Sequence, residues 1–509
     1  MQAQTRAAEM TRIGRSSCLT AGSAHVDHDT ETLFMHIFQR RHVLSTALAL
    51  VLSGGALQAA PLKVDGGRLV DQQGGDVVLR GFNLSSYHKL PPFRPDQDPA
   101  LFNKLAALGV NAVRLQFNWE AFEPAPGVYD ETYLNYYADE VERAGASGIY
   151  VLVDIHQDGF SRWALNGCGD GFPRWAMAPG VTQSAPDNGT ACKNWSLQLI
   201  MQQTDQGKLV DYLITPGTPT NVHYMAMLDR LSARFSGSAN VIGYDLYNEP
   251  AVISDARKMA AFYQAGAQRV RVNHGDAVVF VEPEASAGTC LVSTPLAALD
   301  SMGIANAVYA PHYYDTATLL SGLPPLKPYA GCAAANRQLA AKWGMAVMLG
   351  EYGMGPKPIA PYYVDTIYTD LEKAGESGMQ WNYTAEWTPT AMDGWNGEDL
   401  SVVDDMGQLR SNFRPRPYVQ RTAGRYGDWV SQGFAMFTGQ CLGSSYTWSH
   451  DPAKGSTDIF FPAACLGTRS APSVRVVSPS GTASCSWLAA SQRLRCTGAR
   501  KENISVNIQ

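Results

Sequence analysis

Two glutamates stand directly after short apolar runs and could bring two carboxyl groups to one site. Glu249 follows a run that ends in Asn248, and Glu351 follows Gly350 at the end of a later run. In a parallel barrel the carboxyl ends of the strands meet at one face, where barrel enzymes place their catalytic groups. A retaining glycosidase needs two carboxyls about 5–5.5 Å apart. We therefore predict Glu351 as the nucleophile and Glu249 as the acid/base of such a reaction.

The elements that must position this pair are eight short β-branched runs, separated by stretches that include helix-compatible segments. Several runs are apolar without alternation, which is typical of parallel strands buried on both faces. Eight βα units favour an α/β fold of the closed (β/α)8 TIM barrel type, and no GxGxxG follows the first run to support a dinucleotide fold. The runs are Val78–Ser85, Ala112–Phe117, Tyr150–His156, Val241–Pro250, Ala277–Pro283, Val308–Tyr314, Ala346–Gly353 and Met379–Trp387.

Further polar residues stand in these runs or at their ends. Arg114 lies within the second run, and we expect its guanidinium and the Tyr313 hydroxyl to lower the pKa of the nucleophile and to orient it. His312 is expected beside the acid/base. Asn248 is expected to bind the sugar 2-hydroxyl, a contact that strengthens in an oxocarbenium-like transition state. For Arg114 a structural ion pair is the alternative, and for Tyr313 it is simple packing.

A long insertion separates the third run from the fourth. It contains Trp163, Trp175 and Trp195. Because it follows the carboxyl end of a barrel strand, we expect it to lie on the substrate-binding face and to shape that face.

The character of the chain changes after Asn412. The string RPRPY is a proline-rich break, and the remainder alternates short strands with Gly/Ser turns. We predict a catalytic barrel over residues 61–412 and a C-terminal β-sandwich over residues 413–509. The sandwich could be a carbohydrate-binding module, but we favour a structural appendage that packs on the barrel.

The N-terminal region predicts export. From Met35 the chain has a basic segment with Arg40 and Arg41, then an apolar stretch and small residues, which is typical of a signal peptide over residues 35–60 cleaved near Ala59 or Ala60. A twin-arginine leader is the alternative, and the apolar stretch is too short for a permanent membrane helix. Residues 1–34 are predicted to be a start-site extension. The protein is therefore expected to be secreted, either extracellular or periplasmic.

Cysteine usage agrees with export. Eight cysteines remain after the leader, an even number that suggests disulfides, although eight allow about a hundred connectivities. The most economical pairing joins neighbours in sequence, and the absence of zinc-type spacing predicts no metal. That pairing is Cys168–Cys192, Cys290–Cys332, Cys441–Cys465 and Cys485–Cys496.

The charge of the chain excludes one class of partner. The formal net charge is −6, and no Lys/Arg-rich run of the kind that follows a phosphate backbone is present. Nucleic acid is therefore not expected as a partner. The aromatic content of 10% is compatible with sugar binding, although core packing explains most of these residues.

Residues from about 78 to 390 resemble clan A glycoside hydrolases of family 5 in the strings LYNEP, HYYD, GEYG and RLQFNW. The strings HQDGFSRW and GDGFPRWA, Lys89 and Leu90 followed by PPF, and RPRPY are similar to the endoglycoceramidase branch of that family. The resemblance implies retaining hydrolysis with no metal and no organic cofactor. Asp170 and Phe172 depart from the branch, in which we expect asparagine and a small residue, and they leave the sugar identity open.

The resemblance also implies a set of sugar contacts. His156 and Asp158 are expected to bind hydroxyls of the sugar that precedes the cleaved bond. Trp381 is expected to form the floor on which the sugar ring stacks, and Lys89 is a further ligand contact. The alternatives are a strand-end histidine that serves only structure and a tryptophan that belongs to the core.

Three functions follow from these observations. The first is a retaining endo-β-glycosidase that cleaves between the oligosaccharide and ceramide of glycosphingolipids; glucose-linked and galactose-linked ceramides both stay open, and contact with a lipid aggregate or membrane surface is possible. The second is an endo-β-1,4-glucanase or mannanase acting on polysaccharide. The third, a non-catalytic carbohydrate-binding barrel, is disfavoured because binding alone needs no pair of carboxyls at one bond. The first requires an apolar trough for the lipid, with Leu90, Phe93, Met392 and Trp395 as candidates.

Overall fold

The computed structural model describes residues 60–509 except 188–191, 194, 326 and 435–440. The predicted start-site extension and all but the last residue of the predicted signal peptide therefore lie outside the described residues. Within the described ranges, no helix combines the length and the apolar character that a membrane span requires.

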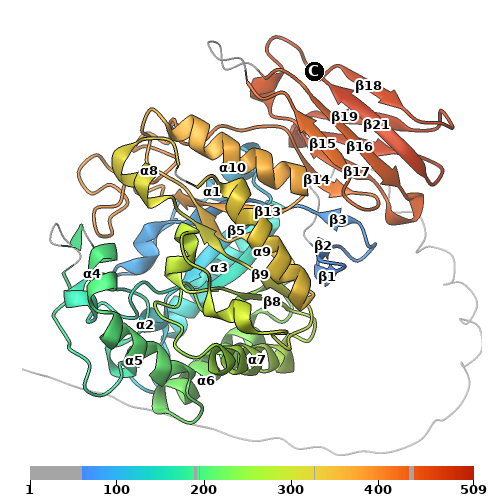
Figure 1. Ribbon diagram of the computed structural model, residues 1–509. Coiled ribbons are helices and arrows are strands. Elements are labelled where there is room, and N and C mark those ends of the chain that lie inside the picture. Colours follow the sequence, from blue (N-terminus) through green and yellow to red (C-terminus); the bar gives the residue numbers. More distant parts are fainter. Residues whose placement is uncertain (1–59, 188–191, 194, 326, 435–440) are drawn as a thin grey trace, which may run out of the picture. The chain divides into compact units, whose positions relative to one another are not determined.

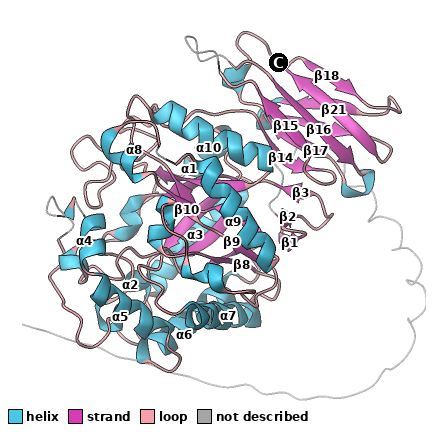
Figure 2. Ribbon diagram, in the orientation of Figure 1, coloured by secondary structure: helices cyan, strands magenta, loops and turns pink. Residues whose placement is uncertain are grey.

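Eight parallel strands close into a barrel in the order β11-β13-β4-β5-β6-β7-β8-β9, which confirms the predicted (β/α)8 fold (Figure 1). Helices surround the strands, as the colouring by secondary structure makes plain (Figure 2). The barrel strands are β4 (Arg80–Leu84), β5 (Ala112–Phe117), β6 (Tyr150–Ile155), β7 (Val241–Asp245), β8 (Val278–Val281), β9 (Ala307–Tyr309), β11 (Ala346–Leu349) and β13 (Ser377–Tyr383). The helices are α1 (Leu101–Ala107), α2 (Trp119–Phe122), α3 (Glu131–Ala146), α4 (Trp195–Met201), α5 (Gln203–Ile214), α6 (Pro219–Phe235), α7 (Ala256–Asn273), α8 (Thr316–Ser321), α9 (Tyr329–Trp343) and α10 (Ala360–Ala374).

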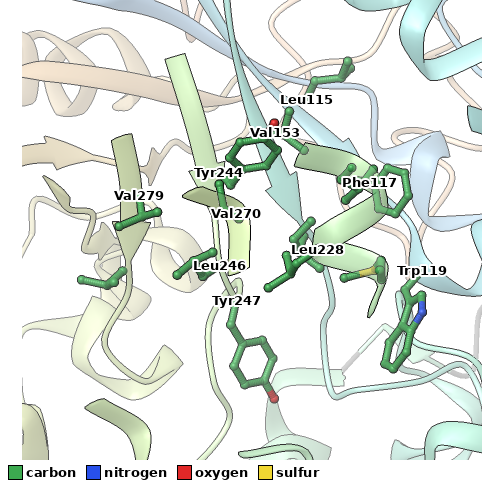
Figure 3. Packing of buried hydrophobic residues seen from close by; sticks show 14 of the residues in the cluster. Leu115, Phe117, Trp119, Val153, Leu228, Tyr244, Leu246, Tyr247, Val270 and Val279 are labelled. Atoms are coloured by element: carbon green, nitrogen blue, oxygen red, sulfur yellow. The ribbon is translucent and has the colours of Figure 1, made fainter. Parts of the chain in front are cut away.

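The alternation of side chains along each strand divides the core into two layers. Outward residues such as Leu115 of β5 and Val153 of β6 pack with Leu228 of α6 and Val270 of α7 (Figure 3). A second cluster draws on all eight strands or the residues next to them and fills the barrel interior, with Ala112 of β5 among its members. The same alternation turns residue 114 of β5 inward, which is how an arginine enters the barrel.

Two of the predicted strands are interrupted. The run from 308 to 314 forms β9 and then β10 (His312–Tyr313), and the run from 346 to 353 forms β11 and then β12 (Glu351–Tyr352). The two short strands pair in parallel, with His312 opposite Glu351. These breaks place His312 beside Glu351 above the barrel.

The C-terminal region contains two antiparallel sheets, in agreement with the predicted β-sandwich. One sheet has the order β15-β16-β21-β18, and the other has the order β1-β2-β3-β14-β17-β20-β19. The N-terminal strands β1 to β3, which we had assigned to the barrel segment 61–412, thus belong to the larger sheet, because β3 pairs with the edge of β14 that would otherwise be open. The strands are β1 (Lys63–Asp65), β2 (Arg68–Val70), β3 (Asp76–Val77), β14 (Tyr418–Thr422), β15 (Asp428–Ser431), β16 (Ser444–His450), β17 (Thr457–Phe460), β18 (Val474–Val477), β19 (Ser484–Leu488), β20 (Arg493–Thr497) and β21 (Glu502–Ile508).

Disulfides join the eight cysteines in the pairing that the sequence order suggested. The four bonds are Cys168–Cys192, Cys290–Cys332, Cys441–Cys465 and Cys485–Cys496. The first bond joins two loop residues of the barrel, the second joins a loop to helix α9, and the other two lie in the C-terminal region. Both parts of the chain therefore carry covalent links.

Candidate active site

Glu351 begins β12, and both oxygens of its carboxylate are held. Arg114 Nη1 donates to Oε1 at 2.7 Å, and the hydroxyl of Tyr314 donates to Oε2 at 2.9 Å. Burial raises the pKa of Tyr314 well above its ordinary value, so the hydroxyl stays a donor. Two fixed donors therefore orient the carboxylate.

The orienting tyrosine is therefore Tyr314, and the expectation for Tyr313 was wrong. The Tyr313 hydroxyl donates to the backbone oxygen of Lys327 at 2.8 Å, and its ring packs against Tyr329 and Tyr363. The reason is strand geometry, because neighbouring residues of a strand point to opposite faces. His312 points to the active site, so Tyr313 points away from it and Tyr314 points back.

Arg114 is fully buried and gathers the polar groups of the barrel mouth around one guanidinium. Its charge is surrounded by carboxylates, which raise its pKa further and outweigh the effect of burial. Its acceptors, at 2.7–3.1 Å, are side-chain oxygens of Asn83, Asp154, Asp245, Asn248, Glu282 and Glu351.

Glu249 and Glu351 both lie at the Nδ1 side of the His312 imidazole. His312 Nδ1 is 2.7 Å from Glu249 Oε1 and 3.5 Å from Glu351 Oε2. One oxygen of each glutamate and one imidazole nitrogen all lie within 4.8 Å of one another. Burial raises the pKa of Glu249, and the charge of Glu351 adds to the rise while His312 opposes it. The pair thus has the close spacing and the unequal surroundings that a retaining mechanism requires.

Glu282 is a third buried glutamate, which the sequence reasoning missed. Its Oε2 accepts a hydrogen bond from the backbone N–H of Glu249 at 2.7 Å, and its Oε1 lies 3.2 Å from His312 Nε2. Burial alone would raise the pKa of Glu282, but His312 and Arg114 outweigh it and hold that pKa at about 2. An ionised Glu282 therefore fixes both the backbone of Glu249 and the imidazole beside it.

The sugar-side residues form a second group next to this pair. The ammonium of Lys89 contacts the carboxylate of Asp158 and lies 4.4 Å from the ring centroid of Trp381 and 3.8 Å from that of Trp395. His156 stacks on Trp381 with 5.5 Å between the ring centroids. The structure thus brings the predicted residues Lys89, His156, Asp158 and Trp381 together.

Fixed charges hold this group in one arrangement. His156 Nδ1 lies 2.7 Å from Asp154 Oδ2, and although burial would lower the pKa of His156, Asp154 raises it to about 10. Asp170 Oδ2 lies 4.0 Å from Lys89 Nζ, and burial and the charge of Asp158 raise the pKa of Asp170 well above its usual range. A protonated Asp170 is a hydrogen-bond donor facing the sugar side.

Asn248 lies between the two groups. Its Oδ1 accepts from Arg114 at 2.8 Å, and its Nδ2 donates to the backbone oxygen of Gln157 at 2.9 Å. A primary amide has two N–H donors. The second donor is therefore available for a sugar hydroxyl, as the sequence suggested.

Two sets of side chains lie close enough to share one ion in the described part of the chain. They are His156 with Asp158 and Asp170, and Glu249 with His312 and Glu351. In each set a cation of the protein already faces the carboxylates. In the first set it is the ammonium of Lys89, and in the second it is the imidazolium of His312. Burial alone would lower the pKa of His312, but the neighbouring carboxylates raise it. The arrangement suits proton transfer and hydroxyl binding.

The family model of cellulases, glycosyl hydrolase family 5, matches residues 70–386, which is more than half of the chain. This chain belongs to glycosyl hydrolase family 5. The match includes both glutamates and Arg114. It also includes the sugar-side residues Lys89, His156, Asp158 and Trp381. The predicted family is confirmed.

Several of the similar proteins are endoglycoceramidases. Endoglycoceramidase I of Rhodococcus hoagii is 28% identical over 425 residues, which cover 78% of this chain and 79% of the relative. Endo-glycoceramidase II from Rhodococcus sp., in a complex with a five-membered iminocyclitol, superposes with a TM-score of 0.69 at 25% identity, covering 87% of this chain and 99% of the other. The same enzyme as a lactosyl–enzyme intermediate gives a TM-score of 0.68 at 25% identity, with the same coverage.

Two of the four residues suggested for a lipid trough lie elsewhere. Trp395 is fully buried, with its ring against the Lys89 ammonium, so it belongs to the sugar side. Phe93 packs against the barrel core and lines a separate pocket with Arg94. Sequence spacing placed both residues near the site but could not tell on which side of the cleaved bond they lie.

Proposed function

We propose that this chain is a secreted retaining endo-β-glycosidase that hydrolyses the bond between the oligosaccharide and ceramide of glycosphingolipids. The observation that carries the proposal is the placement of Glu249 and Glu351 on one imidazole, within 4.8 Å of one another. The relatives that are endoglycoceramidases support the substrate class. The four disulfides support an oxidising location outside the cytoplasm.

In the first step the Glu351 carboxylate attacks the anomeric carbon while Glu249 gives its proton to the oxygen of the leaving ceramide. The bond from the anomeric carbon to that oxygen breaks as the bond to Glu351 forms. Arg114 and Tyr314 hold the attacking carboxylate in line. The raised pKa of Glu249 keeps its proton in place until the leaving oxygen needs it.

In the second step Glu249 acts as a base, whereas in the first step it acts as an acid. Once Glu351 is an ester its negative charge is gone, and with it one of the causes that raise the pKa of Glu249. Glu249 is then a carboxylate that takes a proton from water. The water oxygen attacks the anomeric carbon on the face the ceramide left, and the ester bond from that carbon to Glu351 breaks. The Glu351 carboxylate is regenerated, and the oligosaccharide is released with its β configuration.

We assign recognition of the glycan to the sugar-side group. Trp381 forms the floor for the sugar ring, and Lys89, His156 and Asp158 bind its hydroxyls. Asn248 binds the 2-hydroxyl through its remaining N–H donor. The ceramide lies on the other side of the bond, where the enzyme meets a lipid aggregate or membrane surface.

Product analysis tests the proposal. The purified mature protein is incubated with gangliosides, simple cerebrosides and soluble β-glucan or mannan, and the products are identified by mass. Release of an intact glycan together with ceramide is expected. Activity on the polysaccharides alone would identify a polysaccharide hydrolase instead and would refute the substrate class.

Two variants test the roles of the glutamates. Glu351→Gln should abolish turnover and leave the folded structure intact, because the substitution is nearly isosteric. Glu249→Ala should regain activity in azide and form a β-glycosyl azide, since azide needs no general base. Turnover of Glu351→Gln at the parent rate, or an α-glycosyl azide, would contradict the assignments.

A further inference from the structure

A pocket of about 260 Å³ opens beside the sugar side of the active site, and we call it the distal pocket. Loops that follow β4, β5 and β6 form most of its wall, together with the first turn of α3. Its lining residues are Pro92, Phe93, Arg94, Glu120, Ala121, Pro124, Asp130, Tyr133, Trp163, Pro173 and Arg174.

The distal pocket adjoins the sugar-side group. Phe93 follows Lys89 by four residues, a separation of at most about 14 Å. Asp170, whose carboxyl faces Lys89, is followed by Gly171, and the backbone oxygen of Gly171 accepts a hydrogen bond of 2.9 Å from the N–H of Glu120 in the pocket wall. The loops after β4 and β6 contribute to both sites. We therefore place the distal pocket along the path of the glycan, away from β10 and the leaving group.

Two arginines in the pocket wall are incompletely paired. Arg94 Nη2 lies 3.4 Å from Asp130 Oδ2, and Arg94 Nε is buried without a hydrogen-bond partner among the described residues. Arg174 Nε donates at 3.0 Å to the side-chain oxygen of Gln183, which is neutral. Within the described part of the chain, no carboxylate lies within ion-pair distance of Arg174. Among the described residues, Arg174 therefore keeps a positive charge that no carboxylate neutralises, and Arg94 keeps an unused N–H donor beside its ion pair with Asp130.

The ring of Trp163 in the pocket wall lies beside the guanidinium groups of Arg162 and Arg174. The guanidinium of Arg162 lies 4.8 Å from the ring centroid of Trp163, and that of Arg174 lies 5.9 Å from it. Arg162 itself is paired with Glu120, with 2.9 Å between Nε and Oε2. Trp163 thus provides a rigid apolar wall, and Arg174 is the cation beside it that keeps its charge for a ligand.

We propose that the distal pocket is an outer glycan subsite that takes an acidic sugar, with Arg94 and Arg174 binding the carboxylate of that sugar. Guanidinium groups match a carboxylate in geometry and charge, and the apolar wall suits the carbon skeleton of a sugar ring. The inference rests on the proposed function, because it extends the glycan path from the sugar-side group. It makes the enzyme selective for glycans with a terminal negative charge.

A binding experiment tests the distal pocket without depending on hydrolysis. The Glu351→Gln protein is titrated by calorimetry with lactose and with lactose that carries a terminal sialic acid. The acidic glycan should bind at least about fivefold more tightly, and 0.5 M salt should reduce the difference because it screens exposed charges. Adding Arg94→Gln and Arg174→Gln should remove the preference. Equal affinity for the two glycans would overturn the proposal.

Turnover separates this inference from the proposed function. In the otherwise unchanged enzyme, Arg174→Gln should lower kcat/KM for a sialylated glycosphingolipid about fivefold and leave that for its neutral parent within twofold. Arg257→Gln, on the outer surface of α7, is the matched control and should change neither value. An equal loss on both substrates would refute the pocket's selectivity. If no glycolipid is cleaved at all, the proposed function fails, and the binding preference alone decides on the pocket.

Discussion

The Tyr314 hydroxyl donates a hydrogen bond of 2.9 Å to Oε2 of Glu351, while Arg114 bonds Oε1 of the same carboxylate. Neither oxygen can turn away without losing a buried partner. A hydrogen bond to a charged group contributes about 1.5–3 kcal/mol. The two hydrogen bonds therefore fix the orientation of the carboxylate of the proposed nucleophile.

The first prediction compares Tyr314→Phe with Tyr313→Phe. Tyr314→Phe removes a donor to Glu351 and should lower kcat about 10- to 100-fold, in line with the strength of a bond to a charged group. Tyr313→Phe removes only the bond to the Lys327 backbone, so it should cost about 1 kcal/mol of stability and leave kcat within about twofold. Steady-state kinetics and thermal melts of the two proteins check this. A larger kcat loss in Tyr313→Phe would reverse our assignment.

The second prediction concerns pH. Glu249 must carry its proton to act as the acid, so activity falls as pH rises through the pKa of Glu249. Because burial raises that pKa, the alkaline limb of kcat/KM should lie above the value of about 4.3 for a free glutamate. In Glu249→Gln the remaining activity, measured on a substrate with a good leaving group, should lose this limb. An unchanged alkaline limb in the variant would mean that another group supplies the proton.

Strand alternation explains how much of the site could be predicted. Arg114 shares its inward face with Ala112, so the run itself placed the arginine in the barrel. The same alternation predicts that Tyr314 faces the site. Val308 and Ala310 point into the barrel, and His312 and Tyr314 are the next residues at the same two-residue spacing. The alternation therefore favours Tyr314 over Tyr313 as the tyrosine that faces the site.

The positions of Glu351 and Glu282 could not be predicted from the local sequence pattern. They depend on an interruption of a strand and on the closing of the barrel. Met348 points inward and Leu349 outward, so strict alternation would turn Gly350 inward and Glu351 outward. The interruption between β11 and β12 shifts the phase and brings Glu351 to the site. The meeting of Glu282 with His312 and Arg114 likewise requires the barrel to close, because the three lie on different strands or loops.

The third prediction concerns the disulfides. In the chain-entropy model, the Cys290–Cys332 link, with a sequence separation of 42, contributes about 4 kcal/mol, and the Cys485–Cys496 link, with a separation of 11, about 3 kcal/mol. Replacing both cysteines of the first link by alanine should therefore shorten the half-life at elevated temperature more than the same change in the second. Reduction of the parent protein should give at least the larger loss. A greater effect from the Cys485–Cys496 pair would show that the entropy of loop closure does not dominate here.

The fourth prediction concerns Glu282 and uses Glu284 as its control. Glu282→Gln removes a negative charge from beside His312, so the pKa of His312 should fall. A neutral His312 no longer favours the Glu249 carboxylate, and the pKa of Glu249 should rise further. The alkaline limb of kcat/KM should then move to higher pH, and kcat should fall about 10-fold because the fixed partner of the imidazole is weakened.

Glu284 stands two residues further along and bonds the Thr294 hydroxyl at 2.7 Å, away from the imidazole. Glu284→Gln should lower the melting temperature slightly and leave the pH profile in place. A structural role for Glu282 would lower stability without moving the alkaline limb. The pH profile of the two variants, measured on one substrate at constant ionic strength, thus distinguishes a residue that sets the proton on Glu249 from one that only supports the loop.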